Sequence, residues 1–377
     1  MANRTAPMNS PLAPNSWIGI IGGGQLGRML AMSAAQLGFK VCIYSPEVKC
    51  PASEVASKTI TGSYTDEAAL KEFASIVDVV TYEFENVPTE TVQWLSAAGL
   101  NVRPNRRALE TAQDRLVEKQ FLNSLGANTA AFHPVDDLKS LEEGLAIVGH
   151  RAILKTRRLG YDGKGQTRIT QDSVDLAGDF EKAIDFAWRE VGAAPSILEG
   201  FVDFEREISV IGARSASGDV ALYDPAENVH EDGILNSSSI PTSAPTALID
   251  RAKDITQKVL VSLDYVGVMG VEFFQTKDDV IVNEFAPRVH NSGHWTMDAC
   301  AISQFEQHIR AVAGWPLGDP TRHSDAHMEN LIGVGADQWR DLNRQDQTAI
   351  HLYGKSEMRE GRKMGHFTHI TPRCDRR

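Results

Sequence analysis

Residues 17–45, "WIGIIGGGQLGRMLAMSAAQLGFKVCIYS", constrain the fold of this chain more than any other stretch. A short apolar run leads into a glycine turn, then into a segment with apolar residues at helical spacing, then into a second apolar run. That order predicts a strand, a helix and a second strand. Strand-like and helical segments continue to alternate through residues 78–88 and 100–105. We therefore expect an α/β fold that begins with a Rossmann-like domain built on a parallel sheet.

The glycine turn has the spacing of a dinucleotide-binding site. Gly22, Gly24 and Gly27 fit GxGxxG, in which amides at a helix N-terminus hold a pyrophosphate. Such a site also needs an acidic residue near the end of the second strand to bind a ribose. The sequence there reads "YSPE", and Glu47 is the acid available, beyond a proline. We favour a Rossmann-like sheet whose turn does another job, and a nicotinamide or flavin site stays open as the alternative.

The pattern changes at about residue 119. Short strands joined by hairpins are expected at "AILK", "TRIT", "SILEGFV", "REISVIGARS", "GVMGVEFFQT" and "VIVNEFAPR". Helices are expected near residues 175–191 and 247–263, and the Ser- and Pro-rich residues 236–246 read as a polar loop. A chain of 377 residues is long enough for two or three domains. The expected division is a disordered tail at 1–16, the Rossmann-like domain at 17–118, a central domain at 119–314 and a small β-rich C-terminal domain at 315–377. The final "TPRCDRR" does not read as a natural domain end, so a truncated third domain is expected.

Charge and cysteine usage exclude several classes of protein. A net charge of -12 argues against a broad nucleic-acid surface, so an anionic substrate needs a local cluster of Lys and Arg. The four cysteines are scattered without a CxxC pair, which suggests a reducing compartment and neither a zinc site nor a disulfide framework. The polar start lacks a signal-peptide core, and no stretch approaches the length of a membrane span. We expect a cytoplasmic protein with no nucleic-acid or membrane partner.

The stretch "GYDGKGQ", residues 160–166, reads as the tip of a hairpin between two strands. It does not fit the Walker pattern, but a mobile hairpin with backbone amides and Lys164 can close over a triphosphate. A plain glycine turn with a solvated lysine is the alternative. Lys155 strengthens the first interpretation, because it ends an otherwise apolar strand and needs an anionic partner if it points inward.

Two glutamates lie within apolar strands near residue 280. Glu272 in "GVEFF" and Glu284 in "VNEFAPR" can meet across a hairpin and share one or two magnesium ions, which also contact phosphate oxygens. The alternative is a pair of surface acids that point outward. The loop "PRVHNSGHW", residues 287–295, follows directly and places Arg, His and Asn together. Such a polar loop can orient an anion and an amine nucleophile.

The order of these features resembles the ATP-grasp superfamily, whose members join a carboxylate-type substrate to an amine through an acyl phosphate. Within it, six segments resemble the 5-(carboxyamino)imidazole ribonucleotide synthases: "GGGQLGRML", "YEFENVP", "GYDGKGQ", "ENVHEDGIL", "NEFAPRVHNSGHW" and "GRKMGH". The resemblance extends from about residue 17 to 370. It implies an ATP-grasp central domain with a mobile lid, and an ATP- and bicarbonate-dependent ligase of purine biosynthesis.

The resemblance also implies roles for individual residues. ATP would be bound by Arg115, Lys155, Gly160, Tyr161, Asp162, Gly163, Lys164, Gly165, Gln166, Glu199, Gly200, Phe201, Val202, Glu207, His230, Asn283 and Glu284. Magnesium would be held by Glu272 and Glu284. 5-Aminoimidazole ribonucleotide would be bound by Gln25, Leu26, Glu83, Tyr161, Lys164, Arg288, His290 and Asn291, and its phosphate by Lys355, Arg362 and Lys363. The catalytic residues would be Lys155, Arg288, His290 and Asn291.

The resemblance also bears on cofactors, partners and mechanism. Magnesium is implied and biotin is not, and because the family tends to form dimers, a homodimer is expected. Many ATP-grasp enzymes have Asn two positions after the second metal glutamate, and Ala286 stands there instead, which favours this family over biotin carboxylases and peptide ligases. ATP would convert bicarbonate to carboxyphosphate. This species, or carbon dioxide released from it, would be captured by the exocyclic amine of the ribonucleotide, with His290 or phosphate as proton acceptor. A formate-dependent glycinamide ribonucleotide transformylase, an NAD oxidoreductase and a non-catalytic nucleotide sensor remain the competing hypotheses.

Overall fold

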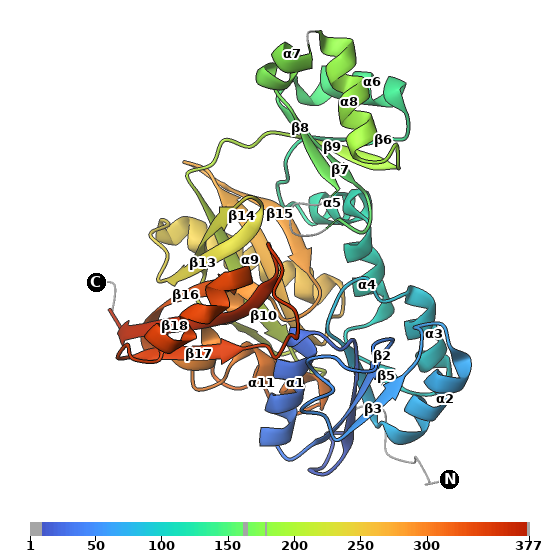
Figure 1. The fold of residues 1–377 in the computed structure, drawn as a ribbon, viewed down its shortest axis with the longest axis vertical. Helices are drawn as coiled ribbons and strands as arrows, with labels where there is room; N and C mark the ends of the chain where they lie inside the picture. The colour runs from blue at the N-terminus through green and yellow to red at the C-terminus, as the bar shows by residue number, and fades with distance from the viewer. Residues whose placement is uncertain (1–9, 161–164, 178, 375–377) are drawn as a thin grey trace.

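A computed structural model describes residues 10–160, 165–177 and 179–374. The N-terminal part is a five-stranded parallel sheet in the order β3-β2-β1-β4-β5. Its strands are β1 (Trp17–Ile21), β2 (Lys40–Ser45), β3 (Lys58–Thr61), β4 (Val79–Tyr82) and β5 (Asn101–Val102). Its helices are α1 (Gln25–Gln36), α2 (Glu67–Ile76) and α3 (Thr89–Ala97). The predicted Rossmann-like domain is confirmed, and it forms the blue part of Figure 1.

The sequence explains the close packing of this sheet. The side chains of β1 from Ile18 onward are buried on both faces, as expected where helices cover a parallel sheet. Gly19 leaves room for helix α2, because a Cβ there would lie 2.5 Å from the ring of Phe73. Helix α2 begins at a capping carboxylate, since Asp66 accepts hydrogen bonds from the amides of Ala68 and Ala69 at 3.0 and 3.1 Å.

A four-stranded antiparallel sheet in the order β6-β9-β7-β8 forms a separate lobe, drawn green at the top of Figure 1. Its strands are β6 (Phe132–Val135), β7 (Ala152–Thr156), β8 (Gln166–Ile169) and β9 (Ser196–Gly200). Its helices are α6 (Leu138–Val148), α7 (Gln171–Ala177) and α8 (Phe180–Glu190), and the helices α4 (Arg106–Gln113) and α5 (Arg115–Ser124) connect it to the N-terminal part. The predicted β7–β8 hairpin is confirmed, and residues 161–164 of its tip lie outside the described residues.

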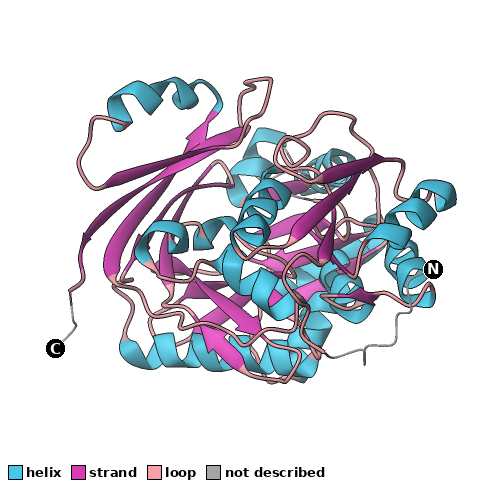
Figure 2. Ribbon diagram, turned by 90° about the horizontal axis from the view of Figure 1, so that it is seen from below, coloured by secondary structure: helices cyan, strands magenta, loops and turns pink. Residues whose placement is uncertain are grey.

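The third sheet is antiparallel and has nine strands, eight of them in the order β15-β14-β10-β12-β13-β16-β18-β17, with β11 paired to β10. These strands are β10 (Arg206–Arg214), β11 (Val220–Leu222), β12 (Ala226–Glu231), β13 (Ile234–Ile240), β14 (Gly267–Gln275), β15 (Val280–Ala286), β16 (Ser324–Ile332), β17 (Thr348–Leu352) and β18 (Lys363–Pro372). The associated helices are α9 (Thr246–Ser262), α10 (Thr296–Ala299), α11 (Gln304–Val312), α12 (Trp339–Leu342) and the 3₁₀ segments η1 (Asn291–Gly293) and η2 (Gly333–Gln338). Figure 2 shows the sheet continuing from the central part into the C-terminal strands.

The prediction of a polar loop over residues 236–246 is wrong for its first half, because residues 236–240 belong to β13. The strand lies between β12 and β16, so its backbone groups are paired on both sides. Ser238 is fully buried and donates a hydrogen bond of 2.7 Å to Asn228 Oδ1. Neighbouring strands therefore satisfy both the backbone and the hydroxyl, which a local pattern of serines does not reveal.

No helix among the described residues is both long and apolar enough to cross a membrane.

Candidate active site

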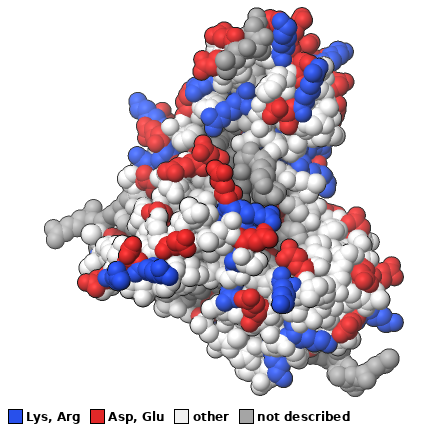
Figure 3. Space-filling view, viewed as in Figure 1, with Lys and Arg blue, Asp and Glu red and all other residues white. Residues whose placement is uncertain are grey.

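The candidate site lies where the upper lobe faces the nine-stranded sheet. Strands β7 and β9 supply it from the lobe, β14 and β15 from the sheet, and α5 lies between them (Figure 1). Figure 3 shows acidic side chains gathered where the lobe meets the body, with basic side chains beside them. Such a mixed lining suits a nucleotide that arrives with a metal cation.

Two lysines hold one buried carboxylate on the lobe side of the site. Lys155 Nζ donates to Glu199 Oε2 at 2.9 Å, and Lys119 Nζ lies 3.3 Å from Glu199 Oε1. Burial acts to raise the pKa of Glu199, but the two ammonium groups overcome it and hold the pKa at about 2. The structure thus brings together two predicted ATP-site residues and gives Lys155 an anionic partner.

Lys119 is a site residue that the sequence interpretation missed. It lies on α5 and is 2% exposed. A signal was present, because residues 115, 118, 119 and 122 follow helical spacing and place Lys119 on the same face as the buried Leu122. A lysine on the buried face of a helix needs a carboxylate or carbonyl partner, and that requirement marks Lys119 as a candidate.

The predicted pair of strand glutamates meets across a hairpin. Glu272 on β14 and Glu284 on β15 are direct partners in the register. Glu284 Oε2 lies 2.6 Å from Arg115 Nη1, and Glu272 Oε1 lies 3.3 Å from His290 Nε2. Burial and the charge of Glu284 raise the pKa of Glu272, whereas Arg115 keeps the pKa of Glu284 low in spite of burial.

This donor set fits a magnesium ion. Two carboxylates on neighbouring strands supply the hard oxygen ligands that Mg²⁺ prefers, and few protein ligands leave room for phosphate oxygens. The raised pKa of Glu272 shows that its negative charge is poorly compensated within the protein. A cation between the two glutamates would supply that compensation.

Glu207 and His230 form a second pair, from β10 and β12. His230 Nδ1 lies 2.5 Å from Glu207 Oε2. Burial acts to lower the pKa of His230, but the carboxylate of Glu207 raises it above its ordinary value. Asn283, which was predicted beside the nucleotide, accepts a hydrogen bond of 3.1 Å from Lys119 Nζ at its backbone carbonyl.

In the loop after β15, Arg288 is fixed by a carboxylate from the N-terminal domain. Its guanidinium binds both oxygens of Glu85, with Nη2 at 3.2 Å from Oε1. Burial acts to raise the pKa of Glu85, yet the charge of Arg288 holds it below its usual range. Glu85 was not singled out from the sequence, although it follows Glu83 by two residues in the same motif.

His290 is held by a short chain of hydroxyl groups. Ser209 Oγ donates to Ser292 Oγ at 2.7 Å, and Ser292 Oγ lies 2.8 Å from His290 Nδ1. The Ser292 hydroxyl is therefore left to donate to Nδ1, which assigns the ring proton to Nε2, facing Glu272. Burial lowers the pKa of His290 to about 3, so the ring is neutral.

Asn291 is oriented by the C-terminal part of the chain. Its side-chain amide exchanges two hydrogen bonds of 2.9 Å with Asn330 on β16. Asn330 is buried and also donates to the carbonyl of Leu235 at 2.8 Å. The predicted substrate residue Asn291 is thus held by a strand that lies far from it in the sequence.

The first glycine turn binds a carboxylate of the protein itself. Glu83 accepts hydrogen bonds from the amides of Gly24 and Gly27, the second at 2.6 Å. Gly22 has φ of 108°, and a Cβ there would lie 2.4 Å from Glu83 Cγ. The amides that would hold a pyrophosphate in a dinucleotide site are therefore occupied, and the turn does another job. Gln25 and Leu26, predicted at the ribonucleotide, begin helix α1 beside it.

The three cations predicted for the ribonucleotide phosphate lie in and after the loop that follows β17. Lys355 Nζ donates to the carbonyl of Lys363 at 2.6 Å, which joins the two ends of that loop. The positive charge of Lys355 acts to lower the pKa of Glu83. The charge of Lys363 acts to lower the pKa of Glu272 and of His290. Arg362 Nη1 donates to the carbonyl of Glu357 at 3.0 Å.

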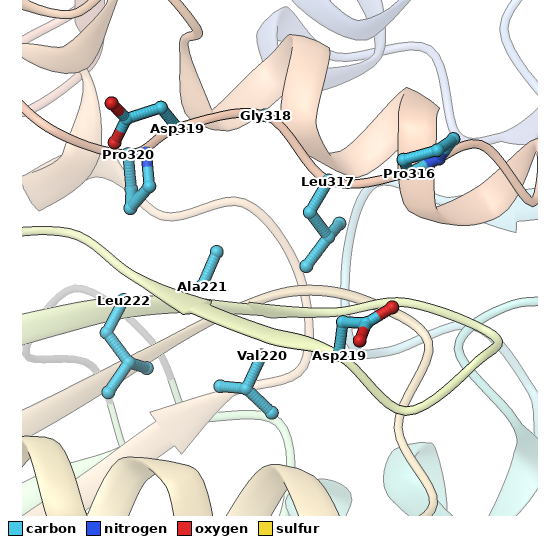
Figure 4. A pocket seen from close by; sticks show the side chains of 9 residues that line it. All are labelled: Asp219, Val220, Ala221, Leu222, Pro316, Leu317, Gly318, Asp319 and Pro320. Atoms are coloured by element: carbon cyan, nitrogen blue, oxygen red, sulfur yellow. The ribbon is translucent and has the colours of Figure 1, made fainter.

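A separate cavity of about 530 Å³ lies between β11 and residues 316–320 (Figure 4). Its two carboxylates are satisfied locally, since Asp219 accepts from Ser217 Oγ at 2.7 Å and Asp319 accepts from the amide of Thr321 at 2.9 Å. No residue of the predicted site lines it. The cavity therefore contributes no side chain to the candidate site.

Comparisons with known proteins cover nearly the whole chain. The model of the ATP-grasp domain matches residues 120–305, that of the ribonucleotide synthetase preATP-grasp domain matches 16–113, and that of the phosphoribosylaminoimidazole carboxylase C-terminal domain matches 326–376. The N5-carboxyaminoimidazole ribonucleotide synthase of Brucella melitensis is 54% identical over 363 residues, which are 96% of this chain and 98% of that protein. The enzyme of the same name from Pseudomonas aeruginosa is 41% identical, with 93% of each chain covered.

Solved structures agree with these matches. A crystal structure described as the ADP complex of an N5-carboxyaminoimidazole ribonucleotide synthetase superposes with a TM-score of 0.91 at 38% identity, covering 97% of this chain and 94% of that one. The Aspergillus clavatus enzyme in complex with ADP and 5-aminoimidazole ribonucleotide gives a TM-score of 0.86 at 29% identity, covering 95% and 94%. With its preATP-grasp, ATP-grasp and carboxylase C-terminal domains in this order, the chain belongs to the N5-carboxyaminoimidazole ribonucleotide synthase family of ATP-grasp ligases.

Proposed function

We propose that this protein carboxylates 5-aminoimidazole ribonucleotide to N5-carboxyaminoimidazole ribonucleotide, with ATP and bicarbonate consumed and ADP and phosphate released, in purine biosynthesis. The observation that carries this function is the facing pair of Glu272 and Glu284, with Arg115 on one carboxylate and His290 against the other. This pair supports a metal site between the proposed nucleotide-binding cations and the polar loop at residues 287–295, as an ATP-dependent ligation requires.

ATP binds in the cleft between the lobe and the nine-stranded sheet. Lys155 and Arg115 contact its phosphates, and residues 160–166 close over them. Residues 199–202 border the adenine, while Glu207, His230 and Asn283 surround the ribose. Support comes from the ion pairs of Lys155 with Glu199 and of Arg115 with Glu284, which bring both cations to the candidate site.

Glu272 and Glu284 would hold magnesium, which would supply charge neutralisation for the transferring phosphoryl group. Arg115 is paired with Glu284 in the structure, so nucleotide binding has to draw this arginine toward the phosphates and free the carboxylate. Arg115 would exchange one anionic partner for another, and Glu284 would then be free to serve as a metal ligand. Biotin has no role in this scheme.

The ribonucleotide binds between the first glycine turn and the loop after β15. Gln25, Leu26 and Glu83 line one side, and Arg288, His290 and Asn291 line the other, with Tyr161 and Lys164 contributed by the hairpin. The phosphate group of the ribonucleotide is bound by Lys355, Arg362 and Lys363. The pairs Arg288–Glu85 and Asn291–Asn330 support this placement, because they fix the orientation of two acceptor-loop side chains before substrate arrives.

The chemistry proceeds in two steps. A bicarbonate oxygen attacks the γ-phosphorus of ATP, the bond to the β-phosphate oxygen breaks, and carboxyphosphate and ADP form. The exocyclic amine then attacks the carboxyl carbon, or carbon dioxide released from carboxyphosphate, and phosphate leaves. Both nitrogens of His290 already face partners, Ser292 and Glu272, so the departing phosphate is the better acceptor for the amine proton.

Phosphate release tests this function directly. We expect release to require ATP, magnesium, bicarbonate and 5-aminoimidazole ribonucleotide together, with one phosphate formed per carboxylated product. Formate with glycinamide ribonucleotide should give no stimulation, which separates this enzyme from the formate-dependent transformylase. Phosphate release that ignores the aminoimidazole ribonucleotide would contradict the proposal.

The domain division and the surroundings of the enzyme are proposed on the same basis. The tail at 1–16, the domains at 17–118 and 119–314 and the C-terminal domain at 315–377 follow the changes in sequence pattern, although helix α5 spans residue 118. We also propose a cytoplasmic homodimer. Light scattering after size-exclusion chromatography checks the dimer.

A further inference from the structure

Helix α5 lies along β15, the edge strand of the nine-stranded sheet, and holds its backbone on both sides of Glu284. Lys119 Nζ donates to the carbonyl of Asn283 at 3.1 Å. Glu118 Oε1 accepts from the amide of Phe285 at 2.7 Å. On this side of β15 the backbone pairs with residues 128–129 at Val282, and no named strand among the described residues continues the pairing. At residues 283–285 the two side chains of α5 therefore take the place of a strand partner.

The third contact falls between these two. Arg115 Nη1 lies 2.6 Å from Glu284 Oε2. Residues 115, 118 and 119 lie three and four positions apart, so they share one face of α5. This face contacts three consecutive residues of the strand, 283–285. The contacts therefore form one unit centred on Glu284.

Burial makes the role of Glu118 specific. Its residue is 2% exposed, and a carboxyl group is seldom buried unless its oxygens are used. Glu118 Oε1 accepts its hydrogen bond from the backbone amide of Phe285, and the side chain of Phe285 takes no part in this contact. An apolar residue at 118 would fill the same space but would offer no acceptor to this amide, so the hydrogen bond is what the carboxyl group adds to packing.

We propose that Glu118 is a positioning residue that, together with Lys119, fixes the backbone on either side of Glu284 and so aims this carboxylate at the metal. This inference rests on the proposed magnesium site. Metal–ligand distances tolerate only small displacements, and hydrogen-bond partners behind the ligands typically change metal affinity about 10- to 100-fold. Glu118 does not contact the ligand Glu284 by a hydrogen bond of its own; it holds the main chain at the next residue, Phe285.

The experiment compares Glu118→Met, which keeps the volume and removes the acceptor, with Glu118→Gln, which keeps an acceptor oxygen. Leu122→Ala is the matched control, because Leu122 is fully buried on the same helix and packs in an apolar cluster. Two quantities are measured: the Mg²⁺ concentration for half-maximal turnover, and ADP binding by calorimetry with Mg²⁺ and with EDTA.

Glu118→Met should raise the Mg²⁺ requirement about 10- to 100-fold and weaken Mg²⁺-dependent ADP binding by a similar factor. ADP binding in EDTA should change less than about twofold, and Glu118→Gln should stay within about threefold of the parent in both assays. Leu122→Ala should lower the unfolding temperature and leave the Mg²⁺ requirement unchanged. If the Met variant does not fold, Glu118→Asp replaces it, because a side chain one methylene shorter no longer reaches the amide of Phe285, and the same rise is expected.

The proposal is overturned if the variant at 118 leaves the Mg²⁺ requirement unchanged, or if Leu122→Ala raises it equally. Glu284→Ala separates this failure from a failure of the proposed metal site. An inactive Glu284→Ala beside an unaffected variant at 118 would remove the positioning role alone, whereas an active Glu284→Ala would remove the metal site itself.

Discussion

At the scale of single residues, the carboxylates of the cleft differ in what balances their charge. Glu284 is paired with Arg115 and Glu199 with two lysines, and in both cases these cations overcome burial and lower the pKa. Glu272 faces His290, which is neutral, so its pKa is raised by burial and by Glu284. The protein therefore keeps one of the two proposed metal ligands ionised, and a bound cation would favour ionisation of the other.

Glu284→Ala is expected to abolish turnover while the protein stays folded. The variant removes a proposed metal ligand and the carboxylate partner of Arg115. The expected cost is about 3 kcal/mol or more of transition-state stabilisation, or roughly a hundredfold or more in rate. Phosphate release at saturating Mg²⁺ measures the loss, with circular dichroism as the check on folding. Activity close to that of the parent would refute the metal assignment.

Arg362→Ala tests the phosphate site of the ribonucleotide. A charge-assisted hydrogen bond is worth about 1.5–3 kcal/mol, so the Michaelis constant for the ribonucleotide should rise about 10- to 100-fold. The constant for ATP should not change, because the proposed ATP site involves other residues than Arg362. Arg359→Ala is the control, since Arg359 is exposed and pairs with Glu357 in the same loop. Equal losses for ATP and the ribonucleotide would contradict the two-site arrangement.

At the scale of elements, the sequence was most informative where its periodicity was strong. Buried strands such as β14 and β15 carry apolar runs that identify them without tertiary information, and the facing of Glu272 and Glu284 follows from their hairpin. Strand β13 was partly missed because serines have no strand preference and are stabilised here by neighbours distant in sequence. Pairing with a remote strand leaves no local pattern.

The site was predicted unevenly for a similar reason. Motif residues such as Lys155 and its partner Glu199 were singled out from the sequence, whereas several residues that orient the site were not. Glu85, Lys119 and Asn330 act through contacts with residues 203, 80 and 39 positions away, respectively. Such contacts depend on how the three sheets are arranged. Helical spacing marks Lys119 as buried, but it does not say which carboxylate or carbonyl the lysine meets.

The turn between β1 and α1 gives a test at this scale. Gly22→Ala should destabilise the protein by about 2 kcal/mol or more, because the residue has φ of 108° and its new methyl group would overlap Glu83. Gly99→Ala is the matched control, with φ of 86° and no atom within 4 Å of the added Cβ. It should cost about 1 kcal/mol, the backbone strain alone. Urea denaturation of both variants checks the difference, and equal losses would argue against the close approach of Glu83.

At the scale of the whole molecule, a buried histidine joins the N-terminal and nine-stranded sheets. His308 on α11 accepts a hydrogen bond from the amide of Val268 on β14 at 3.0 Å, and its other nitrogen lies 2.8 Å from Thr81 Oγ1 on β4. Accepting at Nδ1 leaves the proton on Nε2, so the neutral ring donates to Thr81. Burial lowers the pKa of His308 to about 3.

This histidine should make the protein sensitive to acid. The unfolded chain takes up a proton as the pH falls through about 6.5, whereas the folded chain does not until about 3. Stability is therefore lost across that window, by about 1.4 kcal/mol per pH unit for this residue. His308→Gln should lower stability at pH 7.5 and flatten the pH dependence between pH 6.5 and 4.5. Urea denaturation at several pH values measures it. His327→Gln on the surface should leave the slope unchanged, and an unchanged slope for His308→Gln would contradict the prediction.

The position of β18 in its sheet has a consequence for how the protein is made. Residues 363–372 lie between β16 and β17, so the last of the described strands to be synthesised is an interior strand and not an edge. Until β18 pairs, β16 presents a row of unpaired backbone groups to other chains on the side that β18 will occupy. Domains generally fold as they emerge, but this sheet has to wait for its closing strand. We therefore expect a stage in synthesis at which newly made copies can pair through the open side of β16. Chaperones that bind exposed strands should act at that stage.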